Sequence, residues 1–326
     1  MKMTINFLGD DLFLERLFSC LDAHFSWNIH HITPIKNHVF MIETAEDVFI
    51  LKGYPTYSKL KLQKMFTAEL KKEGFQNTYS YLDMGRNTPF YFDHFYYGII
   101  EYIPSSKKVF TYMDPADREE GLSLLKRYHH TTENLVSRFD KSIRGYQLLK
   151  KWNERKVKFI YNIPLIEFFI EKEIIEEIMN WANWSLRNLE RQHAVFQDSK
   201  VILHGDVAHH NFLRSENENL YLIDFDLISL GDPGLDYLQY ANRILPFLDW
   251  SLEQLSGISV LERFLHDKIF LYGLAFPTDI FREWNRIIKE RQYQNPVKVR
   301  AVVELTKGQF FERKNFIKDL SKKIAE

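Results

Sequence analysis

One short stretch of the chain concentrates side chains that could do chemistry. From Leu203 to Asp226 the sequence reads LHGDVAHHNFLRSENENLYLIDFD, so histidines, aspartates and an asparagine alternate with apolar runs. Carboxylate and amide oxygens bind hard cations, carboxylates accept protons, and both groups occur where phosphates are handled. The residue types therefore leave open a metal site, a proton-transfer site and a phosphate-handling site.

The spacing in this stretch predicts a β-hairpin that brings two oxygen ligands together. The runs FLR and LYLI read as short strands around the polar turn SENEN. A hairpin centred between Asn217 and Glu218 places Asn211 directly opposite Asp224. Opposed residues lie about 5 Å apart at the backbone. This pair suits Mg²⁺, which takes few protein ligands and shares phosphate oxygens.

The residues before the hairpin suggest a second function. Asp206 precedes Asn211 on the approaching loop, where its carboxylate can face a third group. A zinc site from His204, His209 and Asp206 is an alternative, but no metal-binding spacing supports it. We expect His204 to be structural, packed under the loop and hydrogen-bonded to the backbone.

The first hundred residues contain the patterns of a small mixed domain. Apolar spacing predicts that residues 1–30 are helical, and two strand-like runs flank Ala45-Glu46-Asp47 in a hairpin over residues 38–54. An amphipathic helix follows at 59–75 and ends at Gly74. A buried strand at 96–104 stops at Pro104.

The pattern becomes helical after Pro104. Asp114 and Pro115 read as an N-cap and a first helical residue, and residues 165–193 carry a helical apolar stripe. We therefore predict an N-terminal domain at residues 1–103 and a mainly helical domain at 104–326.

Composition excludes several classes of protein. The 326 residues are 45% hydrophobic and 27% charged, which is globular and excludes a disordered or fibrous chain. Lys and Arg number 43 against 44 Asp and Glu, a net charge of −1 that predicts no general affinity for nucleic acid or anionic membrane. The lone Cys20 cannot form an internal disulfide. With acidic residues near the N-terminus and no membrane-spanning run, we expect a cytoplasmic protein.

The motifs together resemble one family. His204-Gly205-Asp206, then Asn211, then Ile223-Asp224-Phe225-Asp226 resembles the catalytic core of the aminoglycoside phosphotransferase and choline kinase-like family. The later run GDPGLDYLQY is similar to the segment that follows in that family. The resemblance implies an α+β, bilobal protein-kinase-like fold with a small antiparallel sheet lobe and a larger helical lobe.

The resemblance also implies a role for each motif residue. Asp206 would orient the acceptor hydroxyl and take its proton, while Asn211 and Asp224 would hold Mg²⁺ on the phosphates of ATP. Asp236 would support the loops from behind, although a charge at a helix N-terminus explains it equally well.

The first domain should supply the nucleotide contacts. In VFILK, Lys52 shares a strand face with Val48 and Ile50 and needs a counter-charge, which phosphates would provide. Glu69 is a candidate partner on the following helix, but family spacing falls nearer Gln63. By resemblance, the backbone from Glu101 to Ile103 would meet the adenine.

Two departures from the family pattern leave a second function open. The nucleotide-loop segment TPIKNHVF has no glycine, and His209-His210 replaces the Pro-Gly-like pair. Over most of its length the chain looks like the spore-coat branch of the family, the CotS- and YutH-like proteins, which implies a coat protein with spore-coat proteins as partners. The missing glycines and the uncertain carboxylate favour such a coat or assembly protein with weak or no activity. The intact motif residues Lys52, Asp206, Asn211 and Asp224 favour an active small-molecule kinase, which is the function we expect.

The acceptor is the remaining question. In the family the helices of the second lobe build its pocket, which here means roughly residues 140–200. An aromatic and acidic lining would suit a cationic or sugar-like acceptor, such as an amino alcohol, a sugar or an aminoglycoside. For any single one of these residues, a place in the helix core or on a solvated helix face explains the side chain better. The candidates are Trp152, Tyr161, Glu167, Glu171, Glu173, Glu176, Glu177, Trp181 and Trp184.

Overall fold

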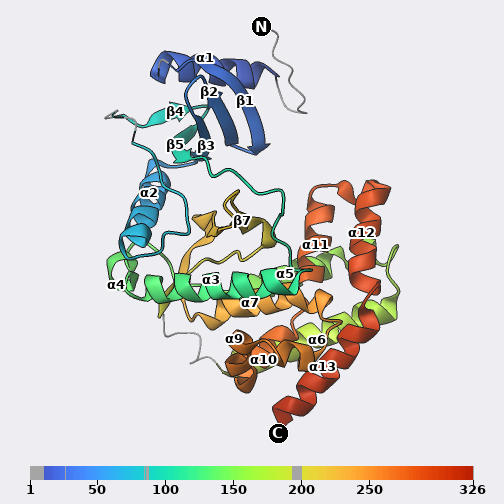
Figure 1. Ribbon diagram of the computed structural model, residues 1–326. Coiled ribbons are helices and arrows are strands. Elements are labelled where there is room, and N and C mark those ends of the chain that lie inside the picture. The colour runs from blue at the N-terminus through green and yellow to red at the C-terminus, as the bar shows by residue number, and fades with distance from the viewer. Residues whose placement is uncertain (1–10, 26, 84, 86–87, 193–199, 326) are drawn as a thin grey trace. The chain divides into compact units, whose positions relative to one another are not determined.

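The chain folds into two compact units. The computed structural model describes residues 11–25, 27–83, 85, 88–192 and 200–325. One unit contains the described residues up to Phe110 together with Asn211–Asp226, and the other contains Thr111–His210 and Leu227–Glu326. Each unit is shown in Figure 1.

The boundary differs from the predicted one because the 211–226 hairpin belongs with the N-terminal residues. Leu222 N donates to Asn77 O (2.9 Å) and Ser106 N donates to Arg214 O (2.8 Å). Phe110 stacks on Phe212 at 4.8 Å between ring centroids. These contacts also carry the first unit past residue 103 to Phe110.

An antiparallel sheet forms the first unit. In the described part of the chain it has five strands. Their order is β1 (Ile29–Lys36), β2 (Val39–Thr44), β3 (Val48–Tyr54), β5 (Phe95–Glu101) and β4 (Phe90–Phe92). The predicted hairpin over residues 38–54 is confirmed as β2 and β3. The strand predicted at 96–104 is present as β5, but it ends at Glu101, before the predicted stop at Pro104.

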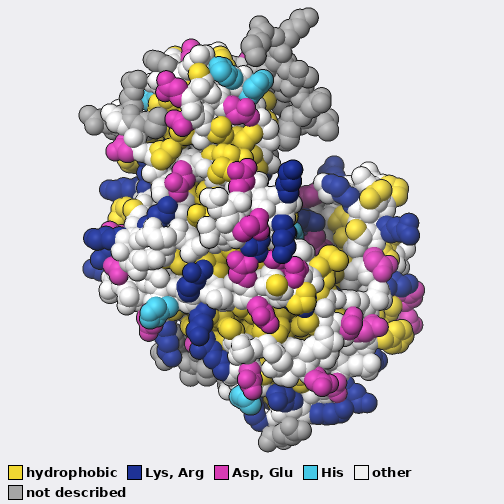
Figure 2. All heavy atoms as spheres, viewed as in Figure 1, with side chains coloured by type: hydrophobic (Ala, Val, Ile, Leu, Met, Phe, Trp, Pro, Cys, Tyr) yellow, Lys and Arg dark blue, Asp and Glu magenta, His cyan; other side chains and the backbone are white. Residues whose placement is uncertain are grey.

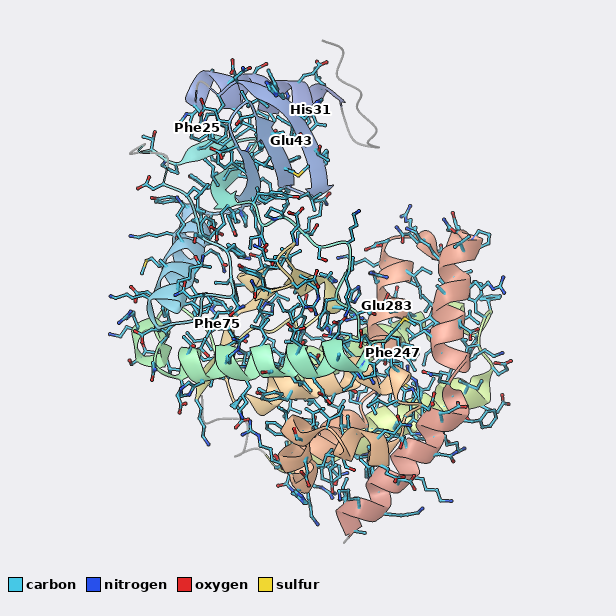
Figure 3. All side chains as sticks on the ribbon, viewed as in Figure 1. Phe25, His31, Glu43, Phe75, Phe247 and Glu283 are labelled. Carbon is cyan, nitrogen blue, oxygen red and sulfur yellow. The ribbon has the colours of Figure 1, made fainter. Side chains whose placement is uncertain are left out.

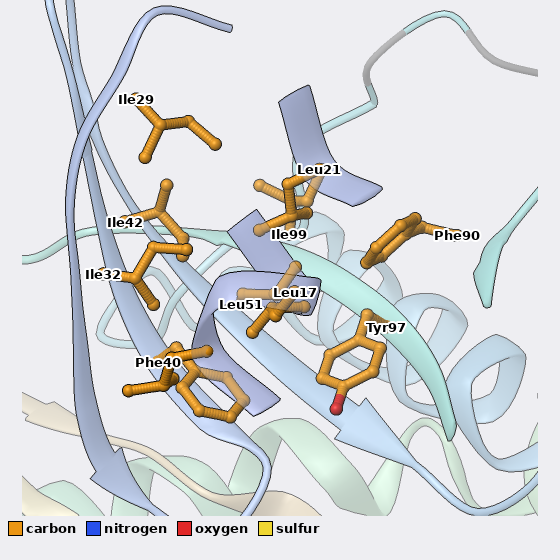
Figure 4. Packing of buried hydrophobic residues seen from close by; sticks show 11 residues of the cluster. Leu17, Leu21, Ile29, Ile32, Phe40, Ile42, Leu51, Phe90, Tyr97 and Ile99 are labelled. Carbon is orange, nitrogen blue, oxygen red and sulfur yellow. The ribbon is translucent and has the colours of Figure 1, made fainter. Parts of the chain in front are cut away.

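Helix α1 (Asp11–Phe25) covers that face. Leu17 and Leu21 of α1 belong to one buried cluster with Leu51 and Ile99 of the sheet, as Figure 4 shows. The predicted helix within residues 1–30 is therefore present but ends at Phe25, since β1 begins at Ile29. Residues 1–10 lie outside the described residues.

Helix α2 (Tyr57–Lys72) carries the candidate partners of Lys52. The Thr56 side chain caps it by accepting from Lys59 N at 3.2 Å, and the chain leaves it at Gly74 with φ of 103°. Only glycine adopts such a φ without strain, which confirms the predicted stop.

The second unit is mainly helical. Its α3 (Pro115–Glu133) begins at the predicted N-cap, Asp114, whose side chain accepts from Ala116 N. The stripe at 165–193 is split, because α5 ends at Ile166 and α6 begins at Lys172. The other helices are α4 (Val136–Phe139), α5 (Leu148–Ile166), α6 (Lys172–Arg191), α7 (Gly234–Ile244), α8 (Leu252–Ser256), α9 (Ser259–Glu262), α10 (Lys268–Leu274), α11 (Thr278–Lys289), α12 (Pro296–Lys307) and α13 (Phe310–Ala325).

Short strands flank the segments that carry Asp206, Asn211 and Asp224. β6 (Val201–Leu203) pairs with β9 (Ser229–Gly231) in the second unit, and β7 (Phe212–Arg214) pairs with β8 (Leu220–Leu222) in the first. Short 3₁₀ turns lie at His209–Asn211, Phe225–Leu227, Leu245–Phe247, Arg263–His266 and Gln292–Gln294.

Aromatic stacking fixes α5 against the helices around it. Trp152 stacks on Phe276 with ring centroids 4.2 Å apart, and Phe159 stacks on Phe281 of α11 at 4.3 Å. Each pair adds about 1 kcal/mol beyond its buried area. The charged positions on α5 therefore have a well-defined place.

Charged side chains of both signs cover the visible surface (Figure 2). Figure 2 shows acidic and basic side chains intermixed on the face in view. Within the described ranges, no helix has both the length and the apolar character that crossing a bilayer requires.

Candidate functional site

The β7–β8 hairpin is present, but its register differs from the prediction by one residue. Phe212 pairs with Leu222, and Ile223 N donates to Asn211 O at 2.9 Å. The prediction that Asn211 lies directly opposite Asp224 is therefore wrong. The turn centres on Asn217, because Glu218 adopts a left-handed φ of 59° and closes a three-residue loop.

Asp224 nevertheless follows the hairpin at the end where Asn211 lies. Its own φ is 70°, a left-handed conformation that aspartate tolerates better than most residues. Asn211 is 2% exposed. Thus an amide and a carboxylate flank the same end of one β-ribbon, which keeps the Mg²⁺ prediction chemically sound.

Lys52 is buried and bonded to two carboxylates. Its Nζ lies 2.7 Å from Asp224 Oδ1 and 3.1 Å from Asp226 Oδ2, and the side chain of Lys52 is 8% exposed. The counter-charge that the strand pattern required is thus supplied by the chain itself. A buried ammonium without such partners would cost several kcal/mol.

Lys36 is a second cation on Asp224 that the sequence reasoning missed. Its Nζ lies 2.5 Å from Asp224 Oδ2, and its side chain is 55% exposed. Lys36 ends β1, next to the glycine-free turn before β2. The sequence showed only that TPIKNHVF contains a lysine. Local periodicity does not predict that this lysine contacts Asp224, because the two residues are far apart in the sequence.

The two lysines set the charge of Asp224. Burial by itself would raise the pKa of Asp224, but the Lys52 charge and the hydrogen bonds from Lys36 and Lys52 outweigh it. The pKa of Asp224 therefore lies well below its usual value, and the carboxylate stays ionised. An ionised carboxylate beside an amide is a donor set that fits Mg²⁺.

Helix α2 carries both candidate partners of Lys52. Gln63 is 1% exposed and its Nε2 donates to Phe225 O at 2.8 Å, so the amide holds the segment that follows Asp224. Glu69 is half-buried on the same helix, and its pairing with Lys52 stays a prediction.

Glu101 has its own contacts at the end of β5. Its backbone N–H donates to Ser80 O at 3.0 Å, and its carboxylate accepts from Ser80 N and Lys71. Because that N–H is engaged, an adenine contact would fall to the residues that follow, up to Ile103. Both positions remain predictions.

Asp206 lies in the second unit, on the loop after β6. Gly205 before it has φ of 77°, and a Cβ there would stand 2.2 Å from Leu227 O. No other residue fits this turn. Arg243 of α7 binds the loop from the side, with Nη2 at 2.7 Å from Asp206 Oδ1.

Asp236 holds the same loop from below. It is fully buried and accepts from His204 N (2.7 Å), Gly205 N (3.0 Å) and His129 Nε2 (2.9 Å). His204 is also buried, and its Nδ1 accepts from Asp206 N at 3.3 Å, which confirms the structural role expected for it. Sequence reasoning missed His129, because nothing local links it to residue 236.

A cavity of about 750 Å³ opens beside Asp206. It lies within the second unit, and Figure 3 labels two residues of its lining, Phe247 and Glu283. The glutamates named as candidates within residues 140–200 do not line it, in agreement with the alternative of a solvated helix face. Trp152 lines the cavity, but Glu171 pairs with Lys307 and Glu177 accepts from Trp181, away from it.

Comparison with known proteins decides the family. A model of the phosphotransferase enzyme family matches residues 35–273, well over half of the chain. The chain belongs to this family. The match spans Lys52, Asp206, Asn211 and Asp224, so the candidate residues lie inside the region that defines the phosphotransferase.

Solved structures show the same fold. The phosphotransferase is similar to an aminoglycoside phosphotransferase from Alicyclobacillus acidocaldarius, with 14% identity, a TM-score of 0.66, and coverage of 91% of this chain and 93% of that one. A spectinomycin phosphotransferase in complex with ADP and spectinomycin has 14% identity and a TM-score of 0.56, with coverage of 94% of this chain and 93% of that one. A GDP complex of an aminoglycoside 2′-phosphotransferase has 11% identity and a TM-score of 0.57, with coverage of 91% of this chain and 98% of that one. The predicted α+β, protein-kinase-like fold is confirmed.

Proposed function

We propose that this chain is an ATP- and Mg²⁺-dependent phosphotransferase that moves the γ-phosphate of ATP to a hydroxyl of a small molecule. The observation that carries the proposal is the ion pair within the first unit between Lys52 Nζ and Asp224 Oδ1, which are 2.7 Å apart. A lysine that binds phosphates and an aspartate that binds their metal are the paired charges that phosphoryl transfer requires.

The roles proposed for the residues follow their chemistry. Lys52 binds the nucleotide phosphates, and the backbone up to Ile103 contacts the adenine. Asn211 and Asp224 are the ligands for Mg²⁺, which when bound neutralises charge on the β- and γ-phosphates. Glu69 of α2 is the carboxylate proposed to pair with Lys52.

Asp206 acts on the acceptor. The hydroxyl oxygen forms a bond to the γ-phosphorus, the bond from that phosphorus to the bridging oxygen breaks, and its electron pair leaves with ADP. The hydroxyl proton passes to the Asp206 carboxylate. Gly205 and Asp236 fix the loop in advance, so that little reorganisation is needed during the reaction.

The test separates binding from turnover. Thermal unfolding with ATP and Mg²⁺ at a hundredfold excess over Kd should show about 2.7 kcal/mol of stabilisation. ADP release should then depend on an acceptor from a panel of sugars, sugar acids, amino alcohols and aminoglycosides. Asp206→Asn should abolish ADP release and keep the thermal shift, whereas an unchanged rate would remove Asp206 from this role.

One observation favours the alternative, a spore-coat or assembly protein with weak or no activity. Both oxygens of Asp224 bind lysine ammonium groups, so a metal ion must compete with Lys36 for that carboxylate. The same experiment decides between the two functions. If the wild type shows no thermal shift with ATP and Mg²⁺ and no ADP release, the result supports the coat protein.

A further inference from the structure

The cavity beside Asp206 is rich in cations. Its charged lining, within the described residues, has five cationic side chains against three carboxylates. The cations are Lys151, Arg155, Arg243, Arg282 and Arg286, and the carboxylates are Asp206, Asp279 and Glu283. This balance is unlike that of the whole chain, which carries a net charge of −1.

The three carboxylates already have partners. Asp206 pairs with Arg243 at 2.7 Å, and Glu283 pairs with Arg282 and Arg286. Asp279 accepts two hydrogen bonds from Arg313 of α13, at 2.6 and 3.1 Å. A cationic ligand would therefore have to displace an arginine from any carboxylate it used.

Two cations of α5 have no such partner. The contacts of Lys151 in the described chain are to the Tyr146 hydroxyl, at 3.5 Å, and to its ring. Arg155 donates to the Thr278 hydroxyl. Both side chains are half-buried, so neither charge is fully compensated by water.

Their placement costs stability. Lys151 and Arg155 are four residues apart on α5 and share a helix face, where like charges repel. Burial lowers the pKa of Lys151, and the charge of Arg155 lowers it further. Burial likewise lowers the pKa of Arg155, and Arg282 and Arg243 add repulsion. An anion between them would remove this cost.

Resting on the proposed function, we infer that the acceptor is an anionic hydroxyl compound whose phosphate or carboxylate group binds Lys151 and Arg155. Guanidinium binds both groups in a two-pronged geometry, and ammonium adds a point charge. The same side chains reject aminoglycosides and amino alcohols, because like charges meet without a free carboxylate.

The rest of the cavity suits a polyhydroxylated body. Burial raises the pKa of Tyr146 to about 12, so its phenol stays protonated and can donate a hydrogen bond. Trp152 and Phe247 supply apolar surface. A volume of about 750 Å³ accommodates a molecule of hexose size or larger.

A matched hexose series tests the inference on the full chain without ATP. D-Glucose 6-phosphate and D-gluconate carry the two anionic groups, D-glucose is neutral and D-glucosamine is cationic. Titration calorimetry at constant ionic strength gives each Kd. We expect at least one anion to bind tenfold or more tightly than D-glucose, and D-glucosamine to bind no more tightly than D-glucose. The anion that binds more tightly shows whether the cavity prefers a phosphate or a carboxylate group.

Variants connect the preference to α5. The double variant Lys151→Gln with Arg155→Gln should lose the tenfold preference. Lys158→Gln, an exposed position on the same helix outside the cavity, should keep it. If the double variant fails to fold, the test rests on whether the wild type binds the anionic hexoses more tightly than D-glucose. Anions that bind no more tightly than D-glucose, or a preference that survives in the double variant, would overturn the inference.

Turnover distinguishes this inference from the proposed function. Selective anion binding without ADP release, when ATP and Mg²⁺ are added, keeps the anion site and overturns the kinase. ADP release with D-glucosamine but neither anion keeps the kinase and overturns the anion site. If the double variant slows ADP release equally with every hexose, the cations act on the transferred phosphate and the inference is wrong.

Discussion

Arg243 and Asp206 form an ion pair inside the helical unit, with Nη2 of the arginine 2.7 Å from Oδ1 of the aspartate. Arg243 comes from α7, and Asp206 follows β6. The residue proposed to take the acceptor proton is thus held by a cation from another element. The pair orients the carboxylate of Asp206, which lines the cavity.

Arg243→Gln should slow turnover about tenfold, because a charge-assisted hydrogen bond to Asp206 is lost. The readout is ADP release with the best acceptor, and ATP binding should be unchanged. Arg243→Lys should restore part of the rate, since it returns the charge. Wild-type turnover in the glutamine variant would show that the pair does not position Asp206.

Lys52→Met should remove most of the stabilisation by ATP, because the phosphates lose their buried cation. At the concentration that stabilises the wild type by about 2.7 kcal/mol, we expect less than about 1 kcal/mol. Lys61→Met, on the exposed face of α2, is the matched control. Equal thermal shifts in the two variants would rule out phosphate binding by Lys52.

Gly205→Ala should destabilise the chain by at least about 2 kcal/mol and abolish turnover. A left-handed φ is strained for alanine, and its Cβ would overlap Leu227 O. Gly257→Ala is the control, since a Cβ there meets its nearest neighbour at 3.4 Å. Chemical unfolding measures both, and similar stabilities would contradict the strain.

Acid should destabilise the folded chain through Asp236. Burial alone would raise the pKa of Asp236, but His129 and the Gly205 N–H outweigh it and hold the pKa below its ordinary value of about 3.9. The ionised carboxylate therefore stabilises fully above that value, and the contribution is lost as pH falls through the folded pKa.

Asp236→Asn tests this relationship. At pH 7 we expect a loss of about 3 kcal/mol, because a buried ion-pair partner is removed. Tm of the variant should then fall less between pH 5 and pH 3 than Tm of the wild type. Exposed Asp140→Asn should follow the wild type. If Tm falls equally with pH in the wild type and both variants, groups other than Asp236 cause the loss of stability in acid.

Local sequence patterns predicted much of the fold and the order of the chemical residues. The Thr56 and Asp114 caps, the Gly74 stop and the β2–β3 hairpin depend on contacts between near neighbours. The interval from Asp206 to Asn211 is likewise local. Even so, the hairpin register was wrong by one residue, because the conformation of Glu218 decides whether the turn has an odd or even length.

Only the tertiary structure decided which charges meet. Lys36 reaches Asp224 across 188 positions, His129 reaches Asp236 across 107, and Arg243 reaches Asp206 across 37. Helical and strand periodicity say which face of an element is buried, but not which element packs against it. The charge of the cavity depends on that packing. The glutamates of residues 167–177 lie outside its lining, whereas Lys151 and four arginines line it.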